Sequence, residues 1–353
     1  MPVQTIRVTP YTLTLKRPWY GARARMDARA GWLVAVADAA GRIGYGDCSP
    51  SPSASHDLRR NAESALARLA DALSGVDVAH ALERTAAVAD VPAPARCALE
   101  TALLDLRAQV QGVALARMLN AGAAASVRVN ASLGRLDNDI AIRAEAAVLQ
   151  GYTVMKVKVG VFDAGEEVKR LTRLAAALPG DVRLRLDANR AWRAEGAQRF
   201  IAGAAALPVE ALEEPLDDPV PEAFMRLQGE APFPLALDES LPHWLSAHPE
   251  AALAVRRWVL KPMRWGGARR CLTLAAGAAK AGIDVVVTTT VDSAAGSWLA
   301  VHVAAAVNNG LAHGLGTSEW LAEDLGSAPA PENGMVAVPP LGLGFKPSMV
   351  GAA

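Results

Sequence analysis

The segments VMKVK (154–158), VRLRLD (182–187), VEALE (209–213), PLALD (234–238) and WVLK (258–261) form a repeating series in the middle of this 353-residue chain. Each segment is a short apolar run, which predicts a β-strand. The stretches between them have the composition of helices, for example AGEEVKRLTRLAAAL at 164–178. Strands that alternate with helices predict a parallel sheet, and hence an α/β fold of the (β/α)8 barrel type.

Every segment ends on a charged residue, and these residues stand 29, 26, 25 and 23 residues apart along the chain. The residue before each of them is aliphatic. Because side chains alternate along a strand, the aliphatic residues would face the helices and the charged residues would point into the barrel interior. They would lie at the carboxyl ends of the strands, where barrels of this type have their active sites. The five residues are Lys158, Asp187, Glu213, Asp238 and Lys261.

Three of these residues are acids, which would repel one another unless a divalent cation lay between them. Oxygen ligands on neighbouring strands are typical of Mg²⁺ and Mn²⁺ sites. Glu214 and Glu239 directly follow two of the acids, but alternation selects the first acid of each pair. Taken singly, each acid is equally consistent with a helix cap or a salt bridge. Three acids in register favour a metal site.

Lysine is scarce in this chain, which has seven lysines and 29 arginines, and three of the seven are Lys156, Lys158 and Lys261. Lysine can lose its proton on burial, whereas arginine effectively cannot. Lysines on opposite sides of a metal-bound carboxylate could remove a proton alpha to it, while the metal stabilises the resulting enediolate. Lys156 is expected to pair with the acids, and its positive charge would lower the pKa of Lys158.

A set of motifs carries a resemblance that runs through nearly the whole chain. In order they are KVK (156–158), RLDANRAW (185–192), LEEP (212–215), LDES (237–240) and LKPMRWGG (260–267). Together they resemble the enolase superfamily, in its muconate-cycloisomerase-like subgroup, a group known for a Lys or His base used with Mg²⁺. The resemblance implies that Asp187, Glu213 and Asp238 are the metal ligands.

Within the subgroup, RLDANRAW, LEEP and HGLGTSEWL (313–321) are most similar to the o-succinylbenzoate synthases, hydro-lyases of menaquinone or phylloquinone synthesis. The implied reaction is the dehydration of 2-succinyl-6-hydroxy-2,4-cyclohexadiene-1-carboxylate. Lys158 would abstract the proton alpha to the carboxylate, and Lys261 would stabilise the enediolate while hydroxide leaves. Arg185, on the same inward face as Asp187, would orient the acid or Lys158. Asn189 would donate a hydrogen bond near the site.

Two departures from the family pattern leave the substrate open. The turn TTTVDSAAG (288–296) has Asp292 where relatives carry a Glu, which makes Asp292 a candidate substrate-binding residue. The segment GLGT (314–317) lacks the acids with which dipeptide epimerases bind an ammonium group. This lack weakens the dipeptide epimerase alternative, which stays open together with cycloisomerase and with N-succinylamino acid racemase, which shares both lysines. An alternative of another class is a catalytically silent barrel that binds a small acid, with the charges forming a buried salt-bridge network.

The ends of the chain break the repeat. Residues 1–122 are expected to form an α+β capping domain, with strands near 3–16 and 31–38, and residues 123–321 the catalytic barrel. The Pro- and Gly-rich tail, 322–353, would pack back onto the capping domain, as the resemblance implies. It also implies that loops near 17–27 and 48–56 close over the substrate.

Length and composition agree with a cytoplasmic enzyme, and the resemblance implies that its partner is a small-molecule carboxylate substrate. The 36 basic and 36 acidic residues balance, so nothing points to nucleic acid or to an anionic membrane. Neither a signal peptide nor an apolar run of about 18 residues is expected. The three cysteines have no ligand spacing, which indicates neither zinc nor disulfides. The oligomeric state cannot be read from these patterns.

Overall fold

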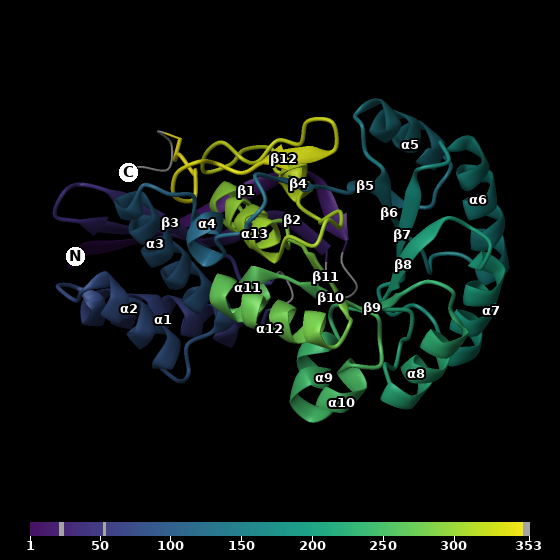
Figure 1. Cartoon of the computed structure of the whole chain (residues 1–353), viewed down its shortest axis with the longest axis horizontal. Helices are drawn as coiled ribbons and strands as arrows, with labels where there is room; N and C mark the ends of the chain where they lie inside the picture. Colours follow the sequence, from purple (N-terminus) through teal and green to yellow (C-terminus); the bar gives the residue numbers. More distant parts are fainter. Residues whose placement is uncertain (21–24, 52–53, 349–353) are drawn as a thin grey trace.

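A three-stranded antiparallel sheet and a group of helices form the first part of the chain (Figure 1). The computed structural model describes residues 1–20, 25–51 and 54–348. In the sheet, the strands lie in the order β1-β2-β3, and both pairings are antiparallel. The elements of this part are β1 (Val3–Tyr20), β2 (Arg25–Asp38), β3 (Ile43–Cys48), α1 (His56–Leu73), α2 (Val78–Ala87), α3 (Ala93–Gln111), α4 (Leu115–Leu119) and β4 (Ser126–Arg128).

The β1–β2 hairpin is longer than the sequence predicted, because pairing continues past residue 16 on one strand and begins before residue 31 on the other. Strand β3 packs closely on α3. A Cβ added at Gly44 would lie 2.1 Å from the Ala102 carbonyl oxygen, and one at Gly46 would lie 2.0 Å from the Ala98 carbonyl oxygen. Both positions therefore require glycine, since any side chain would push the helix off the sheet.

A curled sheet of seven parallel strands forms the second part, which confirms the predicted parallel α/β arrangement. Its order is β11-β10-β9-β8-β7-β6-β5, so neighbours in sequence are neighbours in space, and helices cover its outer face (Figure 1). The elements are β5 (Ala131–Arg135), α5 (Ile140–Leu149), β6 (Val154–Lys158), α6 (Ala164–Ala177), β7 (Arg183–Asp187), α7 (Ala194–Ala204), β8 (Val209–Glu213), α8 (Pro221–Glu230), β9 (Leu235–Leu237), α9 (Leu241–Ala247), α10 (Pro249–Ala252), β10 (Arg257–Leu260), α11 (Pro262–Trp265), α12 (Ala268–Lys280), β11 (Asp284–Val287) and α13 (Ala294–Val307).

The eighth strand expected of a (β/α)8 barrel is not a regular strand in the part of the chain that the structure describes. Instead, residues 313–314 form single parallel bridges, His313 to Val129 beside β5 and Gly314 to Thr288 beside β11. Gly314 has a steric role here, because a Cβ would lie 2.7 Å from the Thr288 methyl carbon. The two edges of the sheet are thus linked through a short glycine-containing segment rather than through a full strand.

The last part of the chain runs back along the first, where Figure 1 shows it in yellow beside β1, β4 and α13. It contains a 3₁₀ helix, η1 (Thr317–Trp320), and the strand β12 (Met335–Ala337), which pairs antiparallel with β4. Leu321 bridges Leu15 of β1, and the Phe345 ring packs edge-on against Tyr45 with ring centroids 5.3 Å apart. No helix among residues 1–20, 25–51 and 54–348 is long and apolar enough to cross a bilayer.

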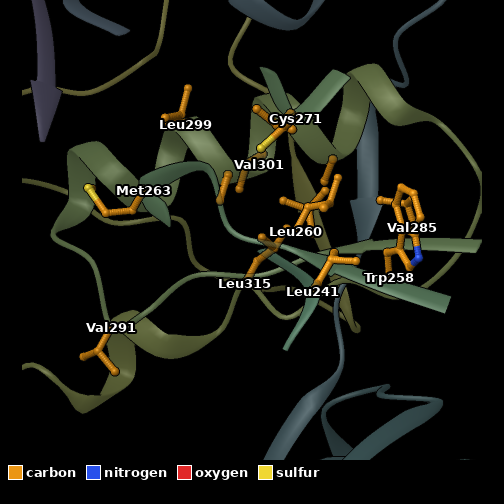
Figure 2. Close-up of a cluster of buried hydrophobic side chains, with 14 of the residues drawn as sticks. Leu241, Trp258, Leu260, Met263, Cys271, Val285, Val291, Leu299, Val301 and Leu315 are labelled. Carbon is orange, nitrogen blue, oxygen red and sulfur yellow. The ribbon is translucent and has the colours of Figure 1, made fainter. Parts of the chain in front are cut away.

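A continuous apolar core fills the space between the curled sheet and its helices. Figure 2 shows the part of this core that joins β10 and β11 to α12 and α13, with Leu260, Val285, Cys271 and Val301 among its members. The free thiol of Cys271 is buried there, as are those of Cys48 and Cys97. The carboxyl ends of the strands are therefore held on a rigid, close-packed support.

Candidate active site

A pocket of about 350 Å³ opens at the carboxyl ends of the parallel strands. Trp19 and Ser51 of the N-terminal part also line it, so both parts of the chain form its wall. Of the loops expected to close over the substrate, residues 21–24 and 52–53 lie outside the described residues. The lining residues are Trp19, Ser51, Asn130, Ser132, Gly134, Lys156, Lys158, Asp187, Asn189, Arg190, Asp238, Glu239, Lys261, Arg264, Thr288, Thr289, Thr290, Gly314, Gly316 and Thr317.

One side of the pocket, the charged half, is formed by ionic residues at the ends of β6 to β10, just after those strands and on α11, with Glu213 buried behind the lining: Lys156, Lys158, Asp187, Glu213, Asp238, Lys261 and Arg264. The ionic residues that end β6, β7 and β8 are in register with one another. Lys158 on β6 lies opposite Asp187 on β7, and Asp187 lies opposite Glu213 on β8. The aliphatic residues before them, such as Leu186 and Leu212, are fully buried in the core. Strand alternation thus has the predicted consequence at these positions.

Lys156 lies between two of the acids, as expected of a residue that pairs with them. Its Nζ hydrogen bonds to Glu213 and lies 2.9 Å from Asp187 Oδ2, while Lys158 Nζ is 3.7 Å from the same Asp187 oxygen. Burial by itself lowers the pKa of Lys156, but Asp187, Glu213 and Asp238 together raise it above its ordinary value. Burial likewise acts against ionisation of Asp187, yet Lys156 and Lys158 hold its pKa well below the usual range.

The third acid has cations of its own. Lys261 Nζ hydrogen bonds to Asp238, and Arg264 donates to Asp238 Oδ1 at 3.0 Å. Burial raises the pKa of Asp238, but Lys261, Arg264 and Lys156 outweigh it, so the net direction is downward. Both Asp187 and Asp238 are therefore held as carboxylates in a site that is otherwise buried.

The donor set of the charged half suits a hard divalent cation, since it consists of three carboxylates on adjacent strands. Within the described residues, no three His, Cys, Asp or Glu side chains stand close enough to enclose an ion, because Lys156 and Lys261 contact the carboxylates instead. One acceptor is left over: Glu213 Oε1 is buried without a hydrogen-bond partner. A cation bound there would satisfy it, so the residues present fit a metal after the two ammonium groups move aside.

Asn189 lies beside Lys158 in the pocket wall. Its Oδ1 accepts a hydrogen bond from Lys158 Nζ, and its Nδ2 donates to Glu239 Oε1 at 3.1 Å. Asn189 and the following Arg190 both have positive φ, 43° and 65°, and this tight turn brings Asn189 back over the strand end. Asn189 was expected to donate a hydrogen bond near the site; the group that receives this hydrogen bond is Glu239, and Asn189 also accepts one from Lys158.

Glu239 is a site residue that sequence reasoning missed. Alternation excluded both second acids, and for Glu214 this holds, since its carboxylate accepts from the backbone N–H groups of Asp238 and Ser240 and from the Ser240 hydroxyl. Glu239, however, follows the end of β9 and lines the pocket. Alternation applies only within a strand, and β9 has already ended at Leu237, so alternation fixes the direction of neither Asp238 nor Glu239, and both line the pocket.

The opposite side of the pocket, the hydroxyl half, carries uncharged polar side chains: Ser51, Ser132, Thr288, Thr289, Thr290 and Thr317. The Thr289 and Thr317 hydroxyls share a hydrogen bond, which ties the end of β11 to η1. Trp19 stands near the mouth of the pocket, with its ring 5.7 Å from Lys158 Nζ and in edge contact with Trp320. The TTT and GLGT motifs were visible in the sequence, but nothing local indicated that they face the charged residues.

Arg185 lies in the floor beneath the pocket and is fully buried. Its guanidinium makes a bidentate ion pair with Glu210 and donates to Asn130 Oδ1 and to the Ala312 carbonyl oxygen. Its recorded partners are thus floor residues and not Asp187 or Lys158. His313 lies in the same layer, where burial lowers its pKa to about 3, and its Nδ1 accepts from the Val287 N–H.

Asp292 is buried behind the pocket and is not one of its lining residues. It accepts a hydrogen bond from Thr290 Oγ1 at 2.5 Å, and its Oδ1 lies 3.5 Å from Arg29 Nη2. The candidate substrate-binding residue therefore reaches the pocket through Thr290, which does line it.

These features define an α/β protein with a polar, two-sided pocket at the carboxyl ends of a curled parallel sheet. Residues 139–349 match the family described as enolase C-terminal domain-like. The chain belongs to the enolase superfamily, in its muconate-cycloisomerase-like subgroup.

Relatives with different activities share this similarity. The chain is 31% identical over 297 residues to the o-succinylbenzoate synthase of Edwardsiella ictaluri, covering 83% of this chain and 84% of the relative. It is 30% identical over 241 residues to the chloromuconate cycloisomerase of Cupriavidus pinatubonensis, covering 67% of this chain and 65% of that enzyme. The fold matches a dipeptide epimerase from Enterococcus faecalis, solved with Mg and L-Leu-L-Tyr, at a TM-score of 0.87 and 22% identity over 98% of this chain and 100% of that chain.

Proposed function

We propose that this protein is a Mg²⁺-dependent o-succinylbenzoate synthase, a hydro-lyase that dehydrates 2-succinyl-6-hydroxy-2,4-cyclohexadiene-1-carboxylate in menaquinone or phylloquinone synthesis. The observation that carries this proposal is the contrast across the pocket. One half has acids and lysines suited to proton abstraction beside a bound carboxylate, and the other half has hydroxyls but no carboxylate at Gly314, Gly316 or Thr317. A substrate ammonium group would find no anionic partner there, which favours an acid over a free dipeptide.

Asp187, Glu213 and Asp238 would hold the Mg²⁺, with Mn²⁺ as a substitute, once Lys156 and Lys261 turn away from their oxygens. A metal bound there supplies electrophilic stabilisation to the substrate carboxylate. Glu213 gains most from this arrangement, because its Oε1 otherwise stays buried without a partner. Lys156 then neutralises the remaining charge of the acids on β7 and β8.

Lys158 would act as the base that takes the proton alpha to the substrate carboxylate. Asn189 accepts a hydrogen bond from Lys158 Nζ and so directs this group toward the pocket. Lys261, on the opposite side of the charged half, would stabilise the enediolate by its positive charge. The C–OH bond then breaks, hydroxide leaves, and the proton held by Lys158 converts that hydroxide into water.

The proposed enzyme is divided into two domains and a C-terminal segment. We infer a capping domain at 1–122, a catalytic barrel at 123–321 and a C-terminal segment at 322–353. The bridges of residues 313–314 to both sheet edges support a closed barrel with this segment in the eighth position. The Leu15–Leu321 bridge and the Tyr45–Phe345 contact support a C-terminal segment that completes the capping domain.

The test is ultraviolet monitoring of 2-succinyl-6-hydroxy-2,4-cyclohexadiene-1-carboxylate with the purified protein and Mg²⁺, beside the same mixture in EDTA. Conversion that EDTA abolishes is the expected result. No conversion would overturn the synthase proposal.

N-succinylamino acid racemase is the second candidate, because two lysines on opposite sides of the charged half would serve proton transfer from either face of a substrate. It predicts that the alpha proton of N-succinylamino acids exchanges with solvent deuterium in the presence of Mg²⁺. Exchange without dehydration would favour the racemase over the synthase.

A further inference from the structure

Arg29, on β2 of the N-terminal sheet, is a fully buried cation outside the pocket. Its guanidinium donates to the carbonyl oxygens of Ser49 and Pro50, both at 2.5 Å, and to the carbonyl oxygen of Val291 at 3.0 Å. These acceptors belong to two segments that are about 240 residues apart in sequence. The planar fork of the guanidinium offers five donors in a fixed geometry, so one side chain can hold both segments at once, whereas a lysine offers three donors from a single nitrogen.

Each segment held by Arg29 is one residue away from the pocket wall. Ser51, which follows Pro50, and Thr290, which precedes Val291, both line the hydroxyl half. Thr290 Oγ1 also lies 3.4 Å from Arg29 Nη2. The distance between these two walls is therefore set behind the pocket, by a side chain that does not line it.

Asp47 provides a second connection between the two segments that Arg29 holds. Asp47 accepts a hydrogen bond from the Ser49 hydroxyl at 3.0 Å and from the Ser293 N–H at 3.1 Å, so it joins the same two segments. Tyr11 donates to the other oxygen of this carboxylate at 2.5 Å. With Asp292 3.5 Å from Arg29, two buried acids, Asp47 and Asp292, lie near the Arg29 guanidinium. Buried ion pairs of this kind add little net stability over apolar packing, so their geometry is the notable feature.

The backbone conformation of Val291 favours its hydrogen bond with Arg29. Val291 has φ of 61°, in the left-handed region that β-branched residues rarely adopt, and its side chain is buried (Figure 2). This conformation directs its carbonyl oxygen at Arg29 Nε. Such outliers persist only where surrounding contacts hold them, and Arg29 is one of those contacts.

We propose that Arg29 is a positioning residue that sets the width of the hydroxyl half by holding residues 49–50 against residues 290–292. This width would select the part of the substrate that lies away from its carboxylate. The enzymatic part of this inference rests on the proposed function. The structural part, that one side chain orders both segments, does not.

The structural part is tested by hydrogen–deuterium exchange of the full chain carrying Arg29→Met. The matched control is Arg257→Met, which also removes a buried guanidinium. Arg257 pairs with Glu210 and with Asp284 at the start of β11, and neither of these partners belongs to residues 49–50 or 290–292. Arg29→Met is expected to speed exchange about tenfold or more in peptides covering 44–51 and 286–296, with β8 unchanged. Unchanged protection in both segments, or a loss equal to that in Arg257→Met, would overturn the proposal.

The enzymatic part is tested by steady-state kinetics on whichever carboxylate the wild-type protein turns over. Arg29→Met is expected to raise KM about tenfold and to leave kcat within about twofold, because Lys158 and Lys261 are untouched. Arg29→Lys should retain the charge and recover only part of the KM. An unchanged KM in Arg29→Met, or an equal fall in kcat in Arg29→Met and Arg29→Lys, would overturn the inference. If the wild type is inactive on every substrate, the proposed function fails, and the exchange experiment still decides whether Arg29 orders both segments.

Discussion

The charged half of the pocket comes from five consecutive strands and the residues just after them, whereas the hydroxyl half comes mostly from loops, a 3₁₀ helix and the N-terminal part of the chain, with Ser132 on β5. In the charged half, Lys158, Asp187 and Glu213 are each oriented by the strand that carries them, in register with one another. In the hydroxyl half, the walls are aimed by contacts between distant segments, such as those of Arg29 and Asp47. The comparison teaches that the groups to which we assign the proton transfer lie on the rigid repeat, while the walls to which we assign selectivity depend on contacts between distant segments.

The largest effect is expected in the charged half. Lys158→Ala should lower the rate at which the alpha proton of the substrate exchanges with solvent deuterium by about 10³-fold, since general-base catalysis contributes a factor of about 10² to 10⁴ to the rate. The measurement is deuterium incorporation followed by proton NMR. Lys169→Ala, which removes an exposed lysine from α6, is the matched control and should retain wild-type exchange. If Lys158→Ala exchanged as fast as this control, the charged half would be an inert salt-bridge network.

The next effect concerns the metal. Glu213→Gln should weaken Mg²⁺ binding at least about tenfold, because it removes a charged oxygen ligand and leaves a neutral amide. Isothermal titration of the full chain with MgCl₂ measures this directly. Glu222→Gln, on the exposed face of α8, is the control. Equal affinity in both variants would show that the three acids do not form the metal site.

A smaller effect is expected in the hydroxyl half. Thr317→Val removes the hydrogen bond to Thr289 and a donor in the pocket wall, and should raise KM about fivefold with little change in kcat. Steady-state kinetics beside Thr172→Val, an exposed threonine on α6, provides the check. A fall in kcat without a change in KM would place Thr317 on the chemical side of the pocket and weaken the division into two halves.

The smallest effect concerns stability behind the hydroxyl half, where Asp324 accepts from the Ala294 N–H at the start of α13. Burial raises the pKa of Asp324 to about 6 from its ordinary 3.8. Between these values the folded chain keeps a proton that the unfolded chain has released, so the free energy of unfolding falls as pH rises. The full shift corresponds to about 3 kcal/mol, and partial exposure reduces this to about 1 to 2 kcal/mol.

Asp324→Asn removes this proton uptake and should therefore flatten the fall in stability between pH 4 and pH 7. Urea unfolding at both values, beside Asp218→Asn at an exposed aspartate, is the measurement. A slope that is unchanged in Asp324→Asn would show that Asp324 is ionised throughout the range in the folded state.

The charged half could be predicted almost completely because its signal is local. A two-residue alternation and a repeat of 23 to 29 residues indicated where Lys158, Asp187 and Glu213 would point, and the register of β6, β7 and β8 has them side by side. The prediction failed one residue further on, at Glu239, because β9 ends at Leu237 and alternation no longer governs direction. A full barrel with a regular eighth strand is not confirmed, since residues 313–314 make only single bridges.

The sequence by itself determined the parallel α/β architecture, the family and the acids and lysines that end the strands, because each of these depends on periodicity within one strand and helix unit. Only the tertiary structure decided that Ser51, Thr290 and Thr317 face those charges, that Arg185 belongs to the floor, and that Arg29 joins two walls of the pocket. These placements depend on contacts between residues far apart in the chain, and no local pattern encodes the distance between them.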